Sequence, residues 1–488
     1  MMSRFPTRPL LLSAAAASAL AACAPVPNLG ARPEIRSADS YAASQSLAGN
    51  TQSQWPVTNW WTAYNDPQLN ALMDEAFRSA PDLAAAAARL RAAQAYAVQA
   101  GASRLPTIDA SGSAAANKIN TGDGLPIKIP SDVQTIGYGT LNLGFDLDLW
   151  GKNRAQFAAA TSEAEAARLE LEQARLALST NIAAAYADLA RLAADRRVQE
   201  RALQVRVETQ KLVTDRVTNG LETRAEEKQA ASAVPAAQAQ LAATDEDIGL
   251  TRNRIAALLG QGPDRGLSIA LPAGPTEAQG IPGDVTTDLI GRRPDIAAAR
   301  ARVEAAASRI KVARAAFYPS IRLSALAGYG SLGLDNLVKG NGASVLQAGP
   351  AISLPIFHGG ALRGQYAGAR ANYDEAVAKY DNSVTTAYHE VADAVTSQKA
   401  LATRLDLSRK ALSDSEQAYA IAQQRYQGGL SRFLDVLTAE ERVLQNRQIV
   451  AGLEARAFAL DVQLVRALGG GFSTNNAAVA ASEVPTHG

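Results

Sequence analysis

The sequence predicts a mainly α-helical chain that also contributes four strands to a membrane β-barrel, and three observations lead to this fold class. Motifs recur at a nearly constant spacing, so the chain consists of two copies of one unit of roughly 200 residues. Each copy contains segments of about ten residues with one apolar and one polar face, a pattern typical of transmembrane strands. The first copy also contains a stretch, residues 154–219, with neither proline nor glycine, which favours a very long helix.

The N-terminus, residues 1–22, has the features of a secretory signal. Two arginines precede an apolar stretch, residues 10–20, that is too short to remain as a membrane helix. The stretch runs into Ala22-Cys23, and Cys23 is the only cysteine of the chain. We interpret this as a bacterial lipoprotein signal rather than an incidental cysteine after an ordinary leader. A covalent lipid on Cys23 is then the expected anchor, and Ala24 rather than Asp after it favours the outer membrane by resemblance to such lipoproteins.

The internal repeat defines the expected domain boundaries. Pro81-Asp82 recurs as Pro294-Asp295, and the segment 216–220 recurs as 425–429, at offsets of 213 and 209 residues. Each unit reads as helix, strand, loop, strand, very long helix, glycine turn and helix. We therefore expect an N-terminal segment at 23–80, repeat 1 at 81–260, a linker at 261–291, repeat 2 at 292–472 and a disordered tail at 473–488.

The strand segments are expected at about 107–150 and 320–357. From Thr140 to Leu149 apolar and polar residues alternate strictly, with leucine or phenylalanine at each odd position. The second copy continues this phase with apolar residues at Ile321, Leu323, Ala325, Ala327 and Tyr329. Such alternation suits a strand with one face toward lipid and the other toward water. Periodicity alone leaves open a half-buried strand of a soluble sheet.

The long helices carry a seven-residue apolar spacing. It is seen at Val198, Val205 and Leu212 in the first copy and between Leu405 and Tyr426 in the second. This spacing predicts a coiled-coil seam. After each glycine turn the chain folds back as a second helix, residues 221–259 and 430–468, which makes two helical hairpins. Pro235 lies in the first returning helix and is expected to kink or interrupt it.

The composition excludes several functional classes. One cysteine cannot form an intramolecular disulfide or a cysteine-based zinc site, and three scattered histidines include no ligand pair. With 48 Lys and Arg against 47 Asp and Glu, the chain has no excess positive charge for nucleic acid. A hydrolase using Asp146 and Asp148, about 7 Å apart on one strand face, lacks an accompanying base. We expect neither enzymatic activity nor a metal or cofactor.

Several motifs, in order and in both copies, carry a resemblance to a known family. They are Asp146 to Lys152 (DLDLWGK), Arg293 to Ile296 (RPDI), Phe317-Tyr318-Pro319, Leu354 to Phe357 (LPIF) and Arg425 to Gly429 (RYQGG). On these residues the mature chain resembles the TolC-like outer-membrane factors. The resemblance implies a homotrimer with a twelve-stranded barrel in the outer membrane, a long α-helical barrel in the periplasm and an equatorial region that holds the termini.

The resemblance also implies a function and partners. Lipoprotein members of this family serve as passive ducts of tripartite efflux pumps, together with a periplasmic adaptor protein and an inner-membrane transporter of the resistance-nodulation-division type. The expected location is the outer membrane of a Gram-negative bacterium, with the helices extending into the periplasm. The outer-membrane duct of a type I protein secretion system and a periplasmic coiled-coil adaptor or scaffold are the alternatives.

Membrane physics independently requires an oligomer. A four-stranded open sheet in lipid would leave edge groups without hydrogen bonds, at several kcal/mol each. Two chains would supply eight strands, whose interior is filled by side chains. Three chains, the number that the family has, is the smallest count that leaves a channel.

The hairpin tips hold the candidate working residues. By resemblance, acids just beyond the second glycine turn line the periplasmic aperture. Asp435 matches one such position and Leu434 one that narrows the opening. Glu226 is equivalent to Asp435 under the repeat, while Arg432 and Arg224 are expected to take part in interhelical ties that hold the closed state. The alternative is that both acids are ordinary solvated residues at a helix start, favoured by the helix dipole.

The turns themselves are expected to meet the adaptor protein. By resemblance, the contact surface includes Arg216, Gly220, Leu221, Arg425, Gly429, Leu430 and Ser431. Glycine at these positions also caps a helix, and the two roles are compatible because a glycine turn lets a partner backbone approach closely.

Overall fold

The computed structural model describes residues 26–37, 40–42, 45–47, 55–118, 133–272, 289–332 and 342–473. The predicted signal peptide, its lipidation site Cys23 and the tail after residue 473 lie outside this part of the chain. Contacts divide the chain into two compact units. The first includes residues 90–167 and 299–380, and the second includes 36–89, 168–298 and 381–488. Each unit therefore takes segments from both sequence repeats.

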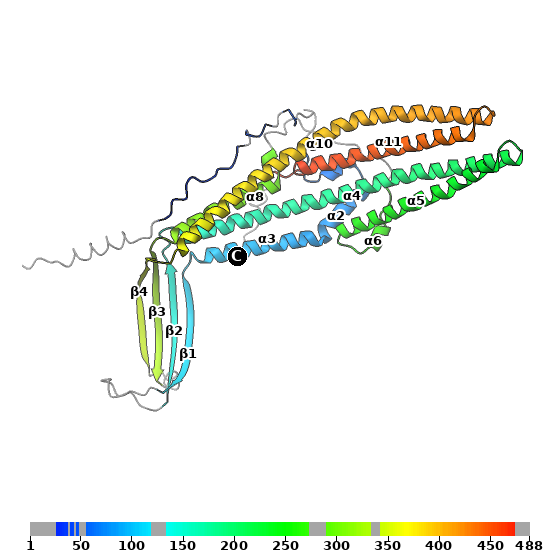
Figure 1. The fold of residues 1–488 in the computed structure, drawn as a ribbon. Helices are drawn as coiled ribbons and strands as arrows, with labels where there is room; N and C mark the ends of the chain where they lie inside the picture. Colours follow the sequence, from blue (N-terminus) through cyan, green and yellow to red (C-terminus); the bar gives the residue numbers. More distant parts are fainter. Residues whose placement is uncertain are drawn as a thin grey trace, which may run out of the picture. The chain divides into compact units, whose positions relative to one another are not determined.

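The first unit contains one antiparallel sheet, ordered β1-β2-β3-β4 (Figure 1). Its strands are β1 (Thr107–Asn117), β2 (Gln134–Asp146), β3 (Ser320–Leu332) and β4 (Ala343–Ser353). Strands β1 and β2 come from the first repeat, β3 and β4 from the second, and the β2–β3 pairing joins the two. Within the described chain, β1 and β4 pair on one side only, so both edges of the sheet are open.

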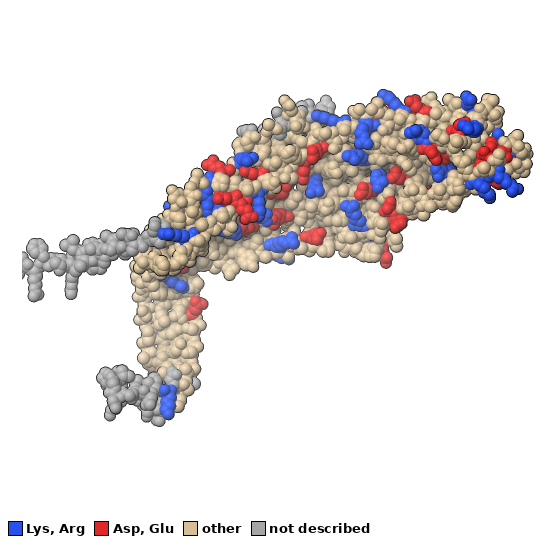
Figure 2. All heavy atoms as spheres, in the orientation of Figure 1, with Lys and Arg blue, Asp and Glu red and all other residues tan. Residues whose placement is uncertain are grey.

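The register gives the sheet one apolar and one polar face. Leu143 lies opposite Ala325 and Phe145 opposite Leu323, and residues directly opposite each other share a face. Asp146 lies opposite Arg322 on the other face, which also carries Asp109. These three are the only charged residues within the four strands. Figure 2 accordingly shows little charge over the sheet compared with the helices.

The strand after which α4 begins is shorter than predicted. β2 ends at Asp146, and Asp148 has a positive φ of 45°, so the chain has already left the sheet there. Asp148 instead accepts hydrogen bonds from the backbone N–H groups of Asn153 and Arg154 and caps α4. The expectation that Asp146 and Asp148 share a strand face is therefore wrong.

The helices reproduce the repeat to the residue. α4 (Lys152–Thr218) and α10 (Ala361–Gln427) each have 67 residues, and α5 (Arg224–Leu258) and α11 (Phe433–Ala467) each have 35. α3 (Pro81–Ala102) and α8 (Pro294–Ala315) each have 22. Pro235 lies inside α5 without interrupting it. Among the described helices, none is apolar enough over a sufficient length to cross a bilayer.

The core of the second unit lies where short N-terminal helices pack against the long ones. Leu69, Leu72 and Met73 of α2 (Pro67–Ser79) are buried against Ile182 and Leu189 of α4. Two tyrosine hydroxyl groups donate inside this core, from Tyr64 to Asp461 at 2.5 Å and from Tyr186 to Asp66 at 2.6 Å. Burial, together with these carboxylates, raises the pKa of both tyrosines, so each remains a donor.

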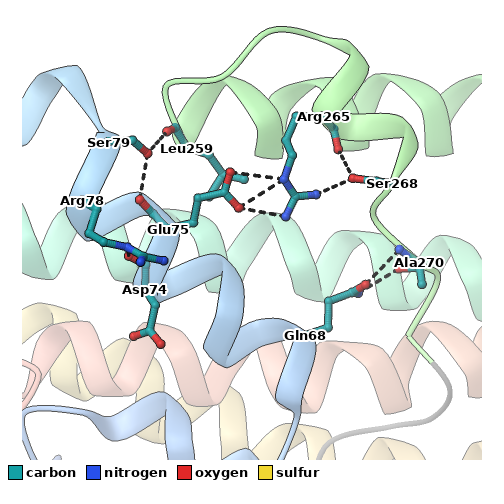
Figure 3. A network of polar contacts seen from close by, with 9 residues as sticks. All are labelled: Gln68, Asp74, Glu75, Arg78, Ser79, Leu259, Arg265, Ser268 and Ala270. Atoms are coloured by element: carbon teal, nitrogen blue, oxygen red, sulfur yellow. Dashed lines mark hydrogen bonds and ion pairs between the residues drawn. The ribbon is translucent and has the colours of Figure 1, made fainter.

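A polar network attaches the end of the first hairpin to α2 (Figure 3). Arg265, in α6 (Asp264–Leu267), pairs with Glu75 at 2.8 Å. The Ser79 hydroxyl donates to the Leu259 carbonyl at 2.7 Å, and the Gln68 amide bonds both backbone groups of Ala270. These bonds satisfy backbone groups at the end of α5 and beyond it, which holds the returning chain on the core.

Candidate functional site

Both hairpins end in the same backbone turn. Gly220 has φ 72° and Gly429 has φ 73°. The next residue, Leu221 or Leu430, donates its N–H to the carbonyl five positions earlier at 2.8 Å. This bond pattern closes a helix C-terminus and requires the left-handed conformation that glycine adopts without cost. The sequence motif that repeats at 209 residues is therefore a repeated helix stop.

The two predicted aperture acids cap the helices that follow these turns. Glu226 accepts from the Thr223 backbone N–H at 3.2 Å, and Asp435 accepts from that of Arg432 at 3.1 Å. Hydrogen bonds from Thr223 also hold the pKa of Glu226 below its usual value. Capping thus accounts for an acid at each of these positions, and both acids remain at the exposed tips.

The predicted ties from Arg432 and Arg224 are not formed between hairpins within this chain. The Arg432 guanidinium pairs at 3.9 Å with Asp435 of its own turn and is otherwise exposed. Arg224 is exposed and makes no ion pair among the described residues. Other residues, which sequence reasoning missed as ties, join the hairpins.

An apolar cluster joins the hairpin tips. Val213 and Ala230 of the first hairpin are buried with Tyr426, Phe433 and Val436 of the second. Of these, the sequence indicated only Tyr426, as a seam position. Contact between the hairpins could not be read from spacing within either one, because the partners are about 200 residues apart.

Arg216 covers this cluster from the first hairpin. Its guanidinium carbon lies 4.6 Å from the centre of the Tyr426 ring, and its Nε lies 3.5 Å from Glu222. The Arg216 side chain is only 17% exposed as a result. Burial and the Glu222 carboxylate raise the pKa of Tyr426 to about 12. Most of the surface of Arg216, which the sequence predicts to contact an adaptor, is therefore buried within the chain.

A second tie crosses between hairpins farther from the tip. Arg206 of α4 lies 3.5 Å from Glu440 of α11, and the Glu440 side chain is 5% exposed. Neither Glu440 carboxylate oxygen accepts a hydrogen bond among the described residues. By contrast, the pairs Arg447–Glu416 and Arg409–Glu454 link helices within one hairpin and are partly exposed.

The second hairpin tip carries a groove of about 620 Å³. Its apolar lining is Ala418, Ile421, Ala422 and Leu430, and its polar lining is Arg425, Ser431, Arg432 and Asp435. Leu430 is 72% exposed and the neighbouring Leu434 is 52% exposed. The groove thus brings together residues that the sequence assigned separately to the aperture and to the adaptor contact.

The two tips differ although their turns are equivalent. Arg425 is exposed at its groove, whereas its counterpart Arg216 is mostly buried. The reason is the presence of an aromatic ring in one hairpin only. Arg216 of the first hairpin stacks on Tyr426 of the second, whereas the first hairpin has Val217 at the position equivalent to Tyr426 and so offers Arg425 no equivalent ring. At the second turn Arg425, Gly429 and Leu430 are exposed and Ser431 is partly buried, whereas at the first turn Arg216 is the residue that is covered.

Acidic and histidine side chains are scattered over the residues that the structure describes. Among them, no three His, Cys, Asp or Glu side chains gather as metal ligands. The Asp146 and Asp148 carboxylates are separated by the end of β2, and Asp148 is used as a helix cap and as the partner of Arg154.

A sheet with one apolar face and one polar face, two open edges and paired helical hairpins with glycine turns defines a class of membrane duct. The particular family follows from comparison with known proteins. The model of the family described as "Outer membrane efflux protein" matches residues 72–261 and 285–470. The chain belongs to the outer membrane efflux protein family.

Individual relatives agree with this assignment. The chain is 30% identical over 442 residues to the pyoverdine export outer membrane protein OpmQ of Pseudomonas putida, covering 89% of this chain and 93% of that protein. It is 36% identical over 350 residues to the fusaric acid resistance protein FusA of Burkholderia cepacia, covering 70% of this chain and 64% of FusA. The outer membrane protein VceC from Vibrio cholerae, whose crystal structure is known, is 46% identical in sequence to this chain. The two structures match with a TM-score of 0.79 over 86% of this chain and 100% of VceC.

The family assignment confirms the predicted fold class and the resemblance to TolC-like channels. It also decides among the functional classes. The chain is an outer-membrane efflux channel component, a transport duct rather than an enzyme or a periplasmic scaffold.

Proposed function

We propose that three copies of this chain close one twelve-stranded barrel and form the outer-membrane duct of a tripartite pump for small molecules. The observation that carries the proposal is the four-stranded sheet with open edges at β1 and β4. In hydrocarbon each unpaired backbone group costs several kcal/mol, so these edges must be covered. Pairing of β4 in one copy with β1 in the next covers every edge when the ring closes.

The register supports placing the apolar face toward lipid. Apolar residues of β2 and β3 lie opposite one another, and the same face of β4 carries Leu346, Pro350 and Ile352. The three charged strand residues share the other face, where a water-filled lumen would solvate them.

The groove at the second hairpin tip is the proposed contact for a periplasmic adaptor protein, with an inner-membrane transporter of the resistance-nodulation-division type as the energised partner. Exposed Leu430 offers apolar surface, and Arg425 and Arg432 offer charges at the rim. An apolar centre with a polar rim is the usual composition of a protein interface.

The proposed cargo class is small organic molecules. The relatives are named for pyoverdine export, fusaric acid resistance and, in Pseudomonas putida SrpC, solvent efflux. A water-filled duct selects weakly, so the inner-membrane partner would choose among such molecules.

The oligomer is tested on the full-length chain extracted from membranes in mild detergent. Native mass spectrometry or light scattering should give a mass of three chains. The trimer should withstand dilution, because each interface contains strand pairing. A stable monomer recovered from the membrane with its sheet intact would contradict the proposal, since the edges could not then be satisfied.

Transport is tested separately in cells that lack their own outer-membrane efflux channel. Expression of this chain with a matching adaptor and transporter should lower the accumulation of a fluorescent dye. A trimer that inserts in the membrane but leaves dye accumulation unchanged with each pump tested would argue against small-molecule efflux while leaving the fold in place.

A further inference from the structure

A second groove lies in the first unit, where the sheet meets the helices, and the duct does not use it. It is lined by Trp150 and Arg154 after β2, by Lys311, Arg314 and Tyr318 at the end of α8, and by small residues between them. Its volume is about 590 Å³. Its lining residues follow β2 or precede β3, the two inner strands, and none belongs to the edge strands β1 and β4 at which neighbouring copies would pair.

The groove contains uncompensated positive charge. Arg154 lies 3.3 Å from Asp148, so one of its three cations is neutralised. Asp148 is the cap of α4 and accepts from two backbone N–H groups at 2.9 Å, and its ion pair among the described residues is with Arg154. Lys311 and Arg314 are exposed and have no acidic partner in the described part of the chain. Two free cations, three positions apart on α8, therefore face the groove.

The other wall is aromatic and rigid. The rings of Trp150 and Tyr318 stack with centroids 4.8 Å apart and planes at 22°. The indole N–H of Trp150 donates to the Pro319 carbonyl at 2.6 Å, which fixes the ring although Trp150 is 49% exposed. Leu147 and Leu149 beside it are also exposed. Tryptophan and tyrosine with an apolar body and a polar end favour the boundary between hydrocarbon and water.

The place of the groove in the fold matches this chemistry. β2 ends at Asp146 and β3 begins at Ser320, so Trp150 and Tyr318 lie just beyond the sheet on its helical side. Under the proposed function, on which this inference rests, the sheet spans the outer membrane. The groove then lies at the membrane surface that faces the periplasm, at the level of phospholipid headgroups.

We propose that this groove binds the phosphate of an anionic phospholipid. Lys311 and Arg314 contact the phosphate oxygens, and Trp150 and Tyr318 pack against the glycerol and upper acyl chain. Basic residues at the membrane surface attract anionic lipid by about 1 kcal/mol each, or about fivefold in affinity. An open groove with exposed cations suits a lipid better than a soluble phosphate. The bilayer already restricts the motion of a lipid, so less free energy is lost when the groove binds it.

The test uses the full-length trimer in nanodiscs that contain equal amounts of phosphatidylglycerol and phosphatidylcholine. Native mass spectrometry measures which lipids remain bound as the disc is removed. The wild-type protein should retain phosphatidylglycerol preferentially. Lys311→Gln should reduce this preference about fivefold, and the double variant with Arg314→Gln up to about thirtyfold. The matched control, Arg91→Gln with Arg300→Gln, removes two cations of the same unit outside the groove and should retain it.

Fluorescence quenching and competition by a soluble phosphate test the groove independently of lipid retention. Lipids brominated near the glycerol should quench the part of the fluorescence that is lost in Trp150→Phe, which places Trp150 at lipid. If that part is not quenched, or if the double variant keeps the lipid preference, the proposal is overturned. Glycerol 3-phosphate at millimolar concentration should not displace the lipid, and displacement would assign the groove to a soluble phosphate instead. Trimer mass and dye efflux should be unchanged in the double variant, so failure here is distinct from failure of the duct.

Discussion

Glu440 is buried between the two hairpins with a single charged partner. Arg206 lies 3.5 Å away, and the two carboxylate oxygens accept no hydrogen bond among the described residues. Burial raises the pKa of Glu440, and Arg206 opposes this effect without reversing it, while Glu441 adds to it. The charged form is therefore less favourable in the packed state than in water, as expected for a buried charge with incomplete pairing.

The raised pKa fixes the sign of a pH effect. In the packed state Glu440 holds its proton to higher pH than in an opened state. Its contribution to packing is therefore most favourable at low pH and is lost as pH rises through the raised pKa. The protection of the amide hydrogens near Val213 and Val436, which is their exchange rate compared with the intrinsic rate at the same pH, should fall over that range. Glu440→Gln should remove this dependence and slow exchange at pH 7 by a few-fold, about 1 kcal/mol for relief of a buried unpaired group.

The control for Glu440 is its neighbour. Glu441 is exposed, so Glu441→Gln removes the same charge from the same helix turn and leaves the buried carboxyl of Glu440 in place, although it also removes the smallest of the influences that raise the pKa of Glu440. It should leave the pH dependence of exchange in place. If both variants behave alike, the effect belongs to net charge and not to burial.

The charge and the width of the proposed aperture can be separated at two adjacent residues. Asp435→Asn keeps a capping side chain for the Arg432 N–H and removes only the charge. Cation preference in single-channel recordings should fall while conductance changes little. Leu434 is half exposed, so Leu434→Ala should cost little stability and should raise conductance by widening the opening. Asp406→Asn, on the exposed surface of α10, is the matched control. Unchanged selectivity and conductance in both tip variants would place the constriction elsewhere.

At the scale of elements, the glycine turn serves both hairpins equally as a helix stop. A Cβ added at Gly220 or Gly429 would meet no atom within 4 Å, so alanine costs only the left-handed backbone. That cost is about 1 to 2 kcal/mol at either position. The surroundings differ, because only the second turn leads into the groove lined by Leu430 and Ser431.

The repeat therefore supplies its own control for adaptor binding. Gly220→Ala and Gly429→Ala should loosen their turns to a similar extent, measured by hydrogen exchange at each tip. Only Gly429→Ala should also weaken binding of the adaptor, measured with purified proteins by surface plasmon resonance. Equal loss of binding in both variants would show that the adaptor reads tip stability, or both turns, and not the groove.

At the scale of the whole molecule, the described N-terminal segment runs along the first unit. Arg370 of α10 donates to the Gly30 and Ala31 carbonyls, and the Tyr373 hydroxyl donates to Pro33 at 3.2 Å. Arg370 lies nine residues after the start of α10, or about 14 Å along the helix from that start. Val26, the first described residue, follows Cys23 by three positions.

This arrangement suits an anchor on Cys23 that enters the membrane beside the sheet. Mass spectrometry of the mature N-terminal peptide should show a lipid on Cys23, and an unmodified thiol would refute it. Cys23→Ala should still assemble as a trimer, because strand pairing and not the lipid closes the barrel. Loss of the trimer in this variant would mean that the anchor is needed for assembly.

The elements and their repetition could be predicted from local patterns in the amino-acid sequence. The alternating residues of β2 and β3 form one apolar face, as predicted, and the repeated glycine motif ends a helix. Both features depend on residues that are near one another in the chain. Of the two effects expected at Pro235, an interruption is wrong, because α5 continues through it over 35 residues, and a kink stays a prediction. Asp148 was misjudged as a strand residue, because its role as a cap depends on where β2 ends.

The way in which the two halves join depends on contacts that form only in the folded chain. The stacking of Arg216 on Tyr426, the burial of Glu440 beside Arg206 and the groove between Trp150 and Arg314 each bring together residues that lie far apart in sequence. Equivalent positions in the repeats predict equal roles, yet Arg216 is covered and Arg425 is exposed. Local patterns record which face of an element is apolar. Local patterns do not show which element covers an apolar face, because side chains from both halves of the chain pack together there.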